Sequence, residues 1–389
     1  MTKALRIQLI TIALSSFLPV IAFGQSLQTF NVGKGLKNEK PVLLKDIAQE
    51  VEYIRLETND KCLIGGAGHL IAADADNIIV VDKAFYRFSR DGKFRNSISG
   101  RGKGPGEFVE IAGFDLDTNG GSFYVFDRLG KVMEFNLNGH LIHDQRVSSG
   151  LYATLFDQDL VLNLYSSRLV NLSNGFRVVI NDLKGNPIRQ LLKVDQETMN
   201  SLNYLSVQNT RCYNYRDSTT IWEGLCDTVY RISKDFRVTP RFYLDLGKDR
   251  LPRVFKLTPN SPDYRHEIDK YTMPMKFFET DRYLYLETSV KGQPKLLICN
   301  KDLGSCTTLP GESQIINDFD GGPDFWPMGI TSEGKMFMLF NVIALKEYWK
   351  PNTENTLKYP ERQKEFIRML EQCNVNDNPI IMVVTPTGK

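Results

Sequence analysis

Short apolar runs separated by polar turns repeat along this chain at a constant spacing. DADNIIVVD (Asp74–Asp82) is a polar turn followed by an apolar run that ends in aspartate, and DLDTNGGSFYVFD (Asp115–Asp127) repeats this pattern. A second run with a hairpin turn follows each copy, and RVVINDLKGNPIRQL is a third copy of that half. The turn glycines Gly92, Gly139 and Gly185 lie 47 and 46 residues apart. A constant period of this length, built from short strands, predicts propeller blades of four antiparallel strands each.

Less regular copies continue towards the end of the chain, and the alternation YLYL at residues 283–286 is typical of a half-buried strand. We therefore predict an all-β fold, a β-propeller of six blades. The ring has to be closed, because an open ring would expose unpaired sheet edges. The segment LQTFNV, residues 27–32, is the one that we expect to complete the last blade.

Two segments depart from the strand pattern. Apolar side chains recur at helical spacing after Pro360, a residue that suits a first helical turn: Phe366, Met369, Leu370 and Cys373. We predict a short C-terminal amphipathic helix over residues 360–373, packed on the last blade, with partner binding as the alternative use of its apolar stripe. Residues 248–274 are expected to form a long loop on one rim.

The N-terminus has the pattern of a secretory signal peptide. Lys3 and Arg6 precede a mostly apolar run over residues 7–23, and small residues then stand at the cleavage-determining positions. We predict a signal peptide over residues 1–24, cleavage before Gln25, and a single propeller domain over residues 25–389. A membrane anchor is the alternative. No cysteine follows the apolar run, so the lipobox of a bacterial lipoprotein is missing here.

Charge narrows the classes of partner. The chain has 48 Lys+Arg and 46 Asp+Glu, and removal of Lys3 and Arg6 with the signal peptide leaves a formal charge of zero. A neutral exported protein has no electrostatic basis for binding nucleic acid or an anionic membrane surface. No later segment is long and apolar enough to span a bilayer. We expect a monomer that lies in the periplasm, on the cell surface or outside the cell.

Six cysteines in an exported chain suggest disulfides. Cys299 and Cys306 bracket one polar turn, and Cys212 and Cys226 flank another predicted hairpin, so each pair is a candidate bridge. Cys373 continues the helical stripe and is expected to be a buried thiol. None of the six has the C-x-x-C spacing of metal ligands.

The glycine-rich stretch GRGKGPGEF (Gly100–Phe108) is the first candidate site. It lacks both the Walker pattern and the G-x-G-x-x-G dinucleotide pattern. Consecutive amides in such a loop can bind an anion, which Arg101 and Lys103 would favour. The alternative is structural, with Glu107 and Arg101 holding the loop to its neighbours.

The acidic stretch NDFDGGPDFWP, residues 317–327, is the second candidate site. Exposed aromatic rings next to carboxylates suit sugar recognition, with Trp326 stacking on the sugar and Asp318, Asp320 and Asp324 accepting its hydroxyl hydrogen bonds. Two of the carboxylates could also serve as a hydrolytic pair. The structural alternative is a turn whose aspartates accept hydrogen bonds from backbone amides.

Other motifs give no chemistry. DLDTNG matches the first half of a calcium loop at Asp115, but its twelfth position is Phe126, so a hairpin turn explains it better. His140 and His143 lie three apart on a predicted hairpin, and neither HExxH nor G-x-S-x-G occurs. We predict no catalytic residue, no metal site and no cofactor.

GRGKGPGEF also resembles the G-x-G-x-GPGEF hallmark of a six-bladed β-propeller family that is common in exported proteins of Bacteroidetes and related to NHL-repeat propellers. VEYIRLET (51–58), DTVYRI (227–232), NDFDGGPDFWP and NPIIMV (378–383) resemble further parts of that family. The resemblance covers nearly all of the mature chain. It implies the fold and export, and it implies little about activity, because the family is largely uncharacterised. Many members of that family resemble lipoproteins, whereas this chain lacks the lipobox cysteine.

The predicted function is a non-enzymatic binding scaffold for an envelope protein or a glycan. One alternative is a glycan-active enzyme, hydrolase or lyase, that uses Asp318, Asp320 or Asp324 as acid and base. The other is a structural or sensory domain whose partner is another envelope protein. The fold favours binding only by analogy.

Overall fold

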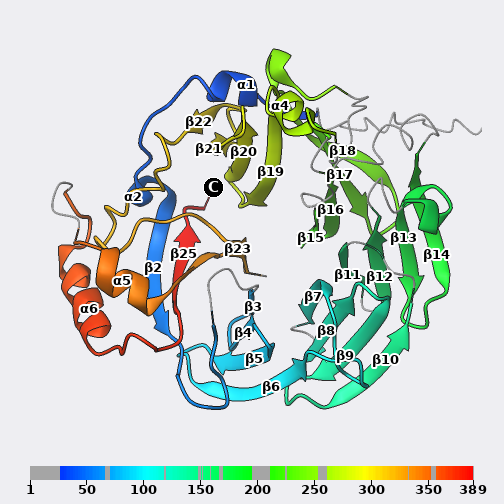
Figure 1. The fold of residues 1–389 in the computed structure, drawn as a ribbon, viewed down its shortest axis with the longest axis horizontal. Helices are drawn as coiled ribbons and strands as arrows, with labels where there is room; N and C mark the ends of the chain where they lie inside the picture. Colours follow the sequence, from blue (N-terminus) through cyan, green and yellow to red (C-terminus); the bar gives the residue numbers. More distant parts are fainter. Residues whose placement is uncertain are drawn as a thin grey trace, which may run out of the picture.

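Six separate β-sheets stand around a central axis in the computed structural model (Figure 1). The structure describes residues 27–388 apart from 66–70, 118–119, 148–149, 151, 158, 166–169, 195–210, 224–225, 253–260, 332 and 352–355. The predicted signal peptide lies outside the described residues. Each sheet has four antiparallel strands, and the fourth sheet has in addition a fifth strand that is parallel to its neighbour. The predicted six-bladed β-propeller is confirmed.

In the first three blades the chain runs from the innermost strand to the outermost one. The first blade has β3 (Ile71–Ala73), β4 (Asn77–Val81), β5 (Ala84–Ser89) and β6 (Phe94–Gly100). The second has β7 (Ile111–Asp117), β8 (Ser122–Asp127), β9 (Lys131–Asn136) and β10 (Leu141–Arg146). The third has β11 (Tyr152–Asp157), β12 (Leu160–Leu164), β13 (Phe176–Asp182) and β14 (Pro187–Lys193). The turns that hold the predicted glycines join their third and fourth strands.

The other three blades have the same order. The fourth has β15 (Arg211–Tyr215), β16 (Ser218–Trp222), β17 (Thr228–Ser233) and β18 (Val238–Leu244). The fifth has β19 (Thr272–Glu279), β20 (Tyr283–Val290), β21 (Gln293–Asn300) and β22 (Cys306–Thr308). The sixth has β23 (Gly329–Ile330), β24 (Met336–Phe340) and β25 (Ile380–Pro386), and it takes its outermost strand, β2 (Ala48–Arg55), from the other end of the chain.

The ring is closed by β2, and the prediction that residues 27–32 close it is wrong. β2 pairs antiparallel with β25 from Ala48 to Arg55, so the N-terminal part of the chain completes the C-terminal blade. β1 (Gln28–Phe30) instead adds a fifth, parallel strand to β18 of the fourth blade. The physical reason is length and pattern: β2 offers eight residues with buried Val51 and Ile54, whereas β1 offers three.

Strands in the middle of a blade are buried on both faces, because each blade lies between two others. All five residues of β4 and all six of β8 are buried. Phe85 of the first blade makes an edge contact with Phe123 of the second, their ring centroids 5.1 Å apart. Continuous apolar runs such as NIIVV therefore arise from packing between blades.

Helices occur between the strands. Two short ones, α1 (Val32–Gly35) and α2 (Leu44–Ile47), lie between β1 and β2. The predicted rim loop, residues 248–274, contains α4 (Tyr264–Ile268), most of the 3₁₀ helix η3 (Gly247–Asp249) and the start of β19. A second 3₁₀ helix, η1 (Val170–Ser173), precedes β13. The helices α5 (Val342–Tyr348) and α6 (Pro360–Glu371) lie between β24 and β25.

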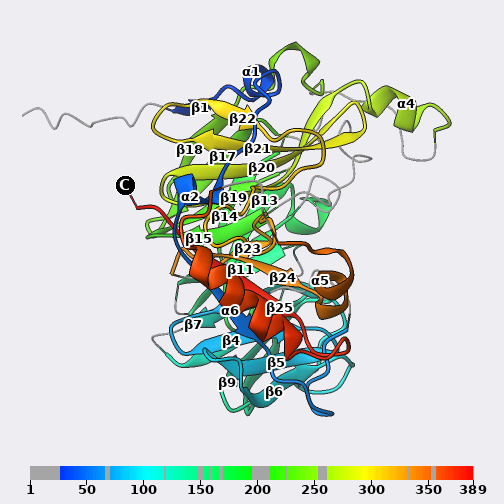
Figure 2. The same cartoon turned by 90° about the vertical axis from the view of Figure 1, so that its left-hand side faces the viewer.

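The predicted amphipathic helix is α6, which ends two residues earlier than predicted. Its Phe366 and Leu370 are buried, and the Phe366 ring lies 4.5 Å from the ring of Tyr53 on β2. The helix lies across the outer side of the sixth blade (Figure 2). It therefore packs on the last blade as predicted and covers part of an edge strand.

Cys299 and Cys306 are joined in a disulfide at the directly paired ends of β21 and β22. The predicted bridge between Cys212 and Cys226 is wrong, because neither is in a disulfide. The turn after β15 is shorter than predicted, so Cys212 pairs with Ile221 while Cys226 lies beyond the end of β16. Cys373 is a buried thiol, as predicted.

Strand order also defines two faces of the ring. Every innermost strand begins on the same face, because each blade has four alternating strands and is followed by a linker to the next blade. We call this the linker face; it holds both candidate loops, 100–108 and 317–327. The opposite turn face holds the turns after the first and third strands of the blades, including residues 90–93.

Candidate functional site

The first candidate loop, residues 100–108, is held by hydrogen bonds of its own glycine amides. The Gly102 amide donates to a main-chain carbonyl inside the loop. The Gly104 amide donates to Glu107 Oε2 at 2.8 Å, and the Gly106 amide donates to Asp144 Oδ2 on β10, also at 2.8 Å. These three amides already have acceptors, so they do not form an open anion site. The structural role predicted for Glu107 agrees with these contacts.

A lysine ties the same loop to the second blade. Lys131 Nζ donates to the carbonyl oxygens of Gly104 and Glu107 at 3.1 and 3.0 Å, and it pairs with Asp144 at 3.1 Å. A side chain at Gly102 would overlap the Glu107 carboxylate. A larger residue at position 102 would therefore displace the Glu107 carboxylate from the Gly104 amide, so glycine preserves one of the contacts that hold the loop.

Arg101 and Lys103 are exposed, and their side chains take no part in this network. Lys61 and Lys83 are exposed on neighbouring loops of the linker face, and the Arg101 amide donates to the Lys83 carbonyl at 3.1 Å. Across the described ranges, none of these four side chains has a carboxylate within ion-pair distance. The linker face therefore presents, near the first blade, four exposed cations that are in no ion pair with a described residue.

Exposed apolar side chains lie on these loops and on the turn between β8 and β9. Leu63 is 52% exposed, Val109 38% and Leu129 55%. The buried carboxylate of Asp127 fixes two of them, because it accepts from the Val109 amide at 2.5 Å and from the Leu129 amide at 2.6 Å. We call the set the basic–apolar surface; its residues are Lys61, Leu63, Lys83, Arg101, Lys103, Val109 and Leu129.

The second candidate loop, residues 317–327, is buried except for Asp324, which is exposed. The Asp318 side chain is fully enclosed; it accepts from the Lys45 amide at 3.0 Å and pairs with Lys45 Nζ at 2.8 Å. Asp320 is 1% exposed, and its Oδ1 accepts from the Tyr53 hydroxyl at 2.9 Å and from Asn317 Nδ2 at 2.8 Å. Both carboxylates therefore hold α2 and β2 to the loop between the fifth and sixth blades, where the ring closes.

The other two residues of this loop also make internal contacts. Asp324 Oδ1 accepts from the Asn317 amide at 2.9 Å, and burial raises the pKa of this carboxyl above its usual value. Trp326 is 6% exposed, its indole donates to Glu287 at 2.9 Å, and its ring packs edge-on against Tyr285. The expectation of an exposed aromatic ring is wrong, because the indole fills the space between the fifth and sixth blades. Ligand binding by Asp318, Asp320, Asp324 and Trp326 stays a prediction without support from these contacts.

Asp115 has a role that the sequence did not indicate. It lies on the innermost strand of the second blade, and its Oδ2 accepts from Thr154 Oγ1 at 2.8 Å and from the Leu155 amide at 2.6 Å in the third blade. Asn214 of the fourth blade donates to the Leu155 carbonyl at 2.8 Å. Burial raises the pKa of Asp115 to about 7. The carboxyl belongs to a polar seam between three blades; among the described residues, no group of three His, Cys, Asp or Glu could hold a metal ion.

Comparison with known proteins identifies relatives of the fold. A family model described as "Domain of unknown function (DUF4934)" matches residues 27–385. A Bacteroides fragilis protein predicted to be exported has a crystal structure that matches with a TM-score of 0.69 and 17% identity, over 93% of this chain and 100% of that one. A DUF4221 member from Bacteroides vulgatus matches with a TM-score of 0.51 and 10% identity, over 87% and 96% of the two chains. The predicted resemblance to exported Bacteroidetes propellers is confirmed.

A more distant structure also matches. A virginiamycin B lyase from Staphylococcus aureus matches with a TM-score of 0.42 and 11% identity, over 86% of this chain and 100% of that one. This similarity is too low to transfer an activity. Among curated proteins, no significant match is found. No helix within the described ranges is long and apolar enough to cross a membrane.

Proposed function

This chain belongs to the DUF4934 family, and we propose that it is an exported, non-enzymatic binding protein that holds a protein partner on its linker face. Export is supported by the similarity to a Bacteroides fragilis protein predicted to be exported. Signal cleavage before Gln25 is part of the proposal, and the family match beginning at residue 27 agrees with it.

The observation behind the proposal is the basic–apolar surface. Exposed apolar side chains surrounded by charged ones are typical of protein-binding sites. The loops that carry them are fixed by buried acceptors such as Asp127, so little conformational entropy is lost when a partner binds. The matching partner has an apolar centre and acidic side chains around it, which would pair with Lys61, Lys83, Arg101 and Lys103.

The glycan-active alternative has less support. Asp318 and Asp320 are enclosed and bonded to Lys45 and Tyr53, so a substrate would have to displace contacts that close the ring. The indole of Trp326 is packed between blades and offers no open face for a sugar. Binding through exposed side chains requires no such rearrangement.

A charge-reversal experiment tests the proposal. The full mature chain, residues 25–389, would be crosslinked in the intact envelope, and the captured proteins of three forms would be compared. We expect the double variant Arg101→Glu/Lys103→Glu to lose a partner that the wild type retains. The matched control is Lys184→Glu, an exposed lysine in a turn on the opposite face, which should retain that partner.

Two results would count against the proposal. One is the same set of captured proteins in all three forms, and the other is a lack of any specific partner for the wild type. Thermal unfolding of each form would show whether the substitutions leave the fold intact. We expect that they do, because the side chains of Arg101 and Lys103 make no hydrogen bond or ion pair within the described chain.

A further inference from the structure

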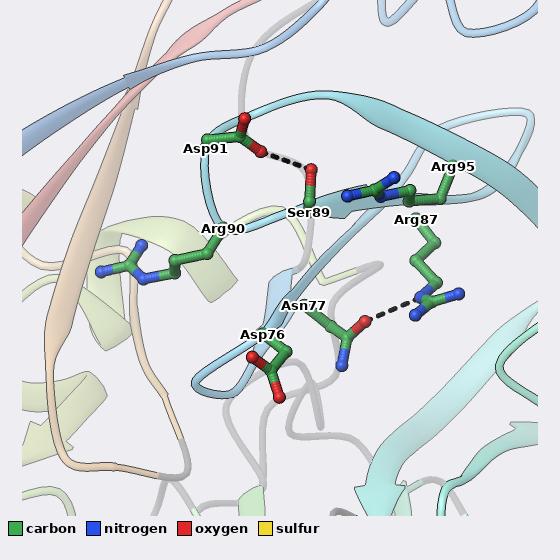
Figure 3. Close-up of a pocket in the computed structure, with 7 residues that line it drawn as sticks. All are labelled: Asp76, Asn77, Arg87, Ser89, Arg90, Asp91 and Arg95. Atoms are coloured by element: carbon green, nitrogen blue, oxygen red, sulfur yellow. Dashed lines mark hydrogen bonds between the residues drawn. The ribbon is translucent and has the colours of Figure 1, made fainter.

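A second surface feature lies on the opposite face. The turn face of the first blade has an open pocket of about 560 Å³ between the turn after β3 and the turn after β5 (Figure 3). Three arginines, two aspartates, an asparagine and a serine line it, with no aromatic side chain. The volume of this pocket is within the usual range for small-ligand sites. Unlike most such sites, the pocket is not lined by apolar side chains. The chemistry of this pocket is therefore that of charge and hydrogen bonding.

The three arginines are not equally neutralised. Arg90 pairs with Glu52 at 2.6 Å. Arg87 and Arg95 have no carboxylate within ion-pair distance anywhere in the part of the chain that is described. Two of the three positive charges at this pocket are therefore left without a counter-charge in contact.

Arg87 is held in place by neutral acceptors. Its Nε donates to Asn77 Oδ1 at 2.7 Å, and its Nη1 donates to the Leu137 carbonyl of the second blade at 3.1 Å. Asn77 is itself fixed by Asp74, which accepts from Asn77 Nδ2 at 3.0 Å. The Nη2 donors have no acceptor among the described residues. The guanidinium is thus oriented by its neighbours and keeps donors for a ligand.

Arg95 lies close enough to affect Arg87. It extends from β6, it is exposed, and its side chain makes no hydrogen bond within the described chain. Burial is the main cause of a lowered pKa of Arg87, and the positive charge of Arg95 lowers this pKa further. The charge of Asp74 offsets part of this effect without forming an ion pair. The two guanidiniums repel each other, and a bound oxyanion would reduce that repulsion.

Two carboxylates also line the pocket. In Figure 3 Asp76 and Asp91 lie to the left of the Arg87 guanidinium, and the Arg95 side chain extends towards Ser89 and Asp91. Asp91 accepts from Ser89 Oγ at 2.5 Å. The Asp76 carboxylate is exposed and receives no hydrogen bond from a described residue. An exposed carboxylate accepts hydrogen bonds from ligand hydroxyls and repels a second anionic group.

We propose that this arginine pocket binds a small oxyanion that also bears hydroxyl groups, such as a sugar acid or a sugar phosphate. The oxyanion lies between Arg87 and Arg95, and the hydroxyls donate to Asp76. This site is on the opposite face from the basic–apolar surface, so it goes beyond the proposed protein partner and can fail independently of it.

Calorimetric titration of the mature chain tests the proposal with four probes. Glucuronate and glucose 6-phosphate have both an oxyanion and hydroxyls, glucose has hydroxyls alone, and inorganic sulfate has charge alone. We expect millimolar binding of glucuronate, glucose 6-phosphate or both, much weaker binding of sulfate, and none of glucose. A preference between the first two identifies the oxyanion as carboxylate or phosphate.

Variants locate the site. Arg95→Ala should weaken the preferred probe about tenfold, and Asp76→Asn should weaken it less, while sparing sulfate. The matched control, Arg146→Ala, removes an exposed arginine from the outermost strand of the next blade and should leave binding unchanged. The proposal is overturned if neither sugar probe binds, if sulfate binds as tightly as they do, or if Arg95→Ala binds like the wild type.

Discussion

Replacing Asp115 with asparagine should make the protein more stable at neutral and alkaline pH. The Asp115 carboxyl lies in the seam between blades, with a pKa that burial raises from 3.8 to about 7. Asparagine keeps an oxygen that can accept from Thr154 Oγ1 and the Leu155 amide, and it removes only the charge. The substitution therefore isolates the cost of ionising a group in this position.

The direction of the pH dependence follows from the raised pKa. Between about pH 4 and pH 7 the unfolded chain has released this proton while the folded chain still holds it, so the stability of the wild type falls as the pH rises. A shift from 3.8 to about 7 corresponds to about 4 kcal/mol at full burial. Because the Asp115 side chain retains partial exposure, we expect Asp115→Asn to raise the free energy of unfolding by about 2–4 kcal/mol above pH 7.

Urea unfolding at several pH values measures this effect. The difference in free energy of unfolding between Asp115→Asn and the wild type should be near zero at pH 4, grow through pH 7 and then level off. Asp217→Asn, which changes an exposed aspartate in the turn after β15, is the control and should follow the wild type. An Asp115→Asn variant that is equally destabilised at every pH would refute a raised pKa for Asp115 in the folded protein.

Three further outcomes are expected. Tyr53→Phe should lower the free energy of unfolding by about 1–3 kcal/mol, measured in urea, because buried Asp320 loses the donor at 2.9 Å. Reductant, or the double change Cys299→Ser/Cys306→Ser, should lower it by about 2 kcal/mol, and reductant should not affect the double variant. Deletion of the N-terminal residues up to the end of β1 should leave a folded but less stable ring, as measured by circular dichroism. Deletion up to the end of β2 should prevent cooperative folding.

The repeat in the sequence was sufficient to predict the blades, because each blade buries its middle strands between neighbours and this burial appears directly as apolar runs. The closing strand could not be assigned from the same pattern. Both 27–32 and 48–55 have strand-like alternation, and the choice depends on which sheet edge is free once the ring forms. That edge belongs to β25, more than 300 residues further along the chain.

The sequence located the two candidate loops between blades correctly. Their chemistry could not be predicted, because it depends on contacts with residues that are distant in the sequence. A carboxylate such as Asp318 has the same local sequence whether it faces solvent or accepts from a buried amide. Arg87 and Arg95 flank one hairpin turn, and their cross-strand proximity could have been inferred from that turn. The lack of a counter-charge beside them depends on distant groups, and only the folded arrangement shows it.

These contacts also decide which variants can report on function. A change at Asp318 or Asp320 leaves Lys45 or Tyr53 with a lost buried partner next to the closing strand. A loss of binding in such a variant would follow from a weakened ring as readily as from a lost ligand contact. Arg95, Arg101 and Lys103 are exposed and lack carboxylate partners within the described chain, so their replacement leaves the ring contacts unchanged. Loss of binding at these exposed positions, with an unchanged unfolding transition, is therefore the result that separates recognition from folding.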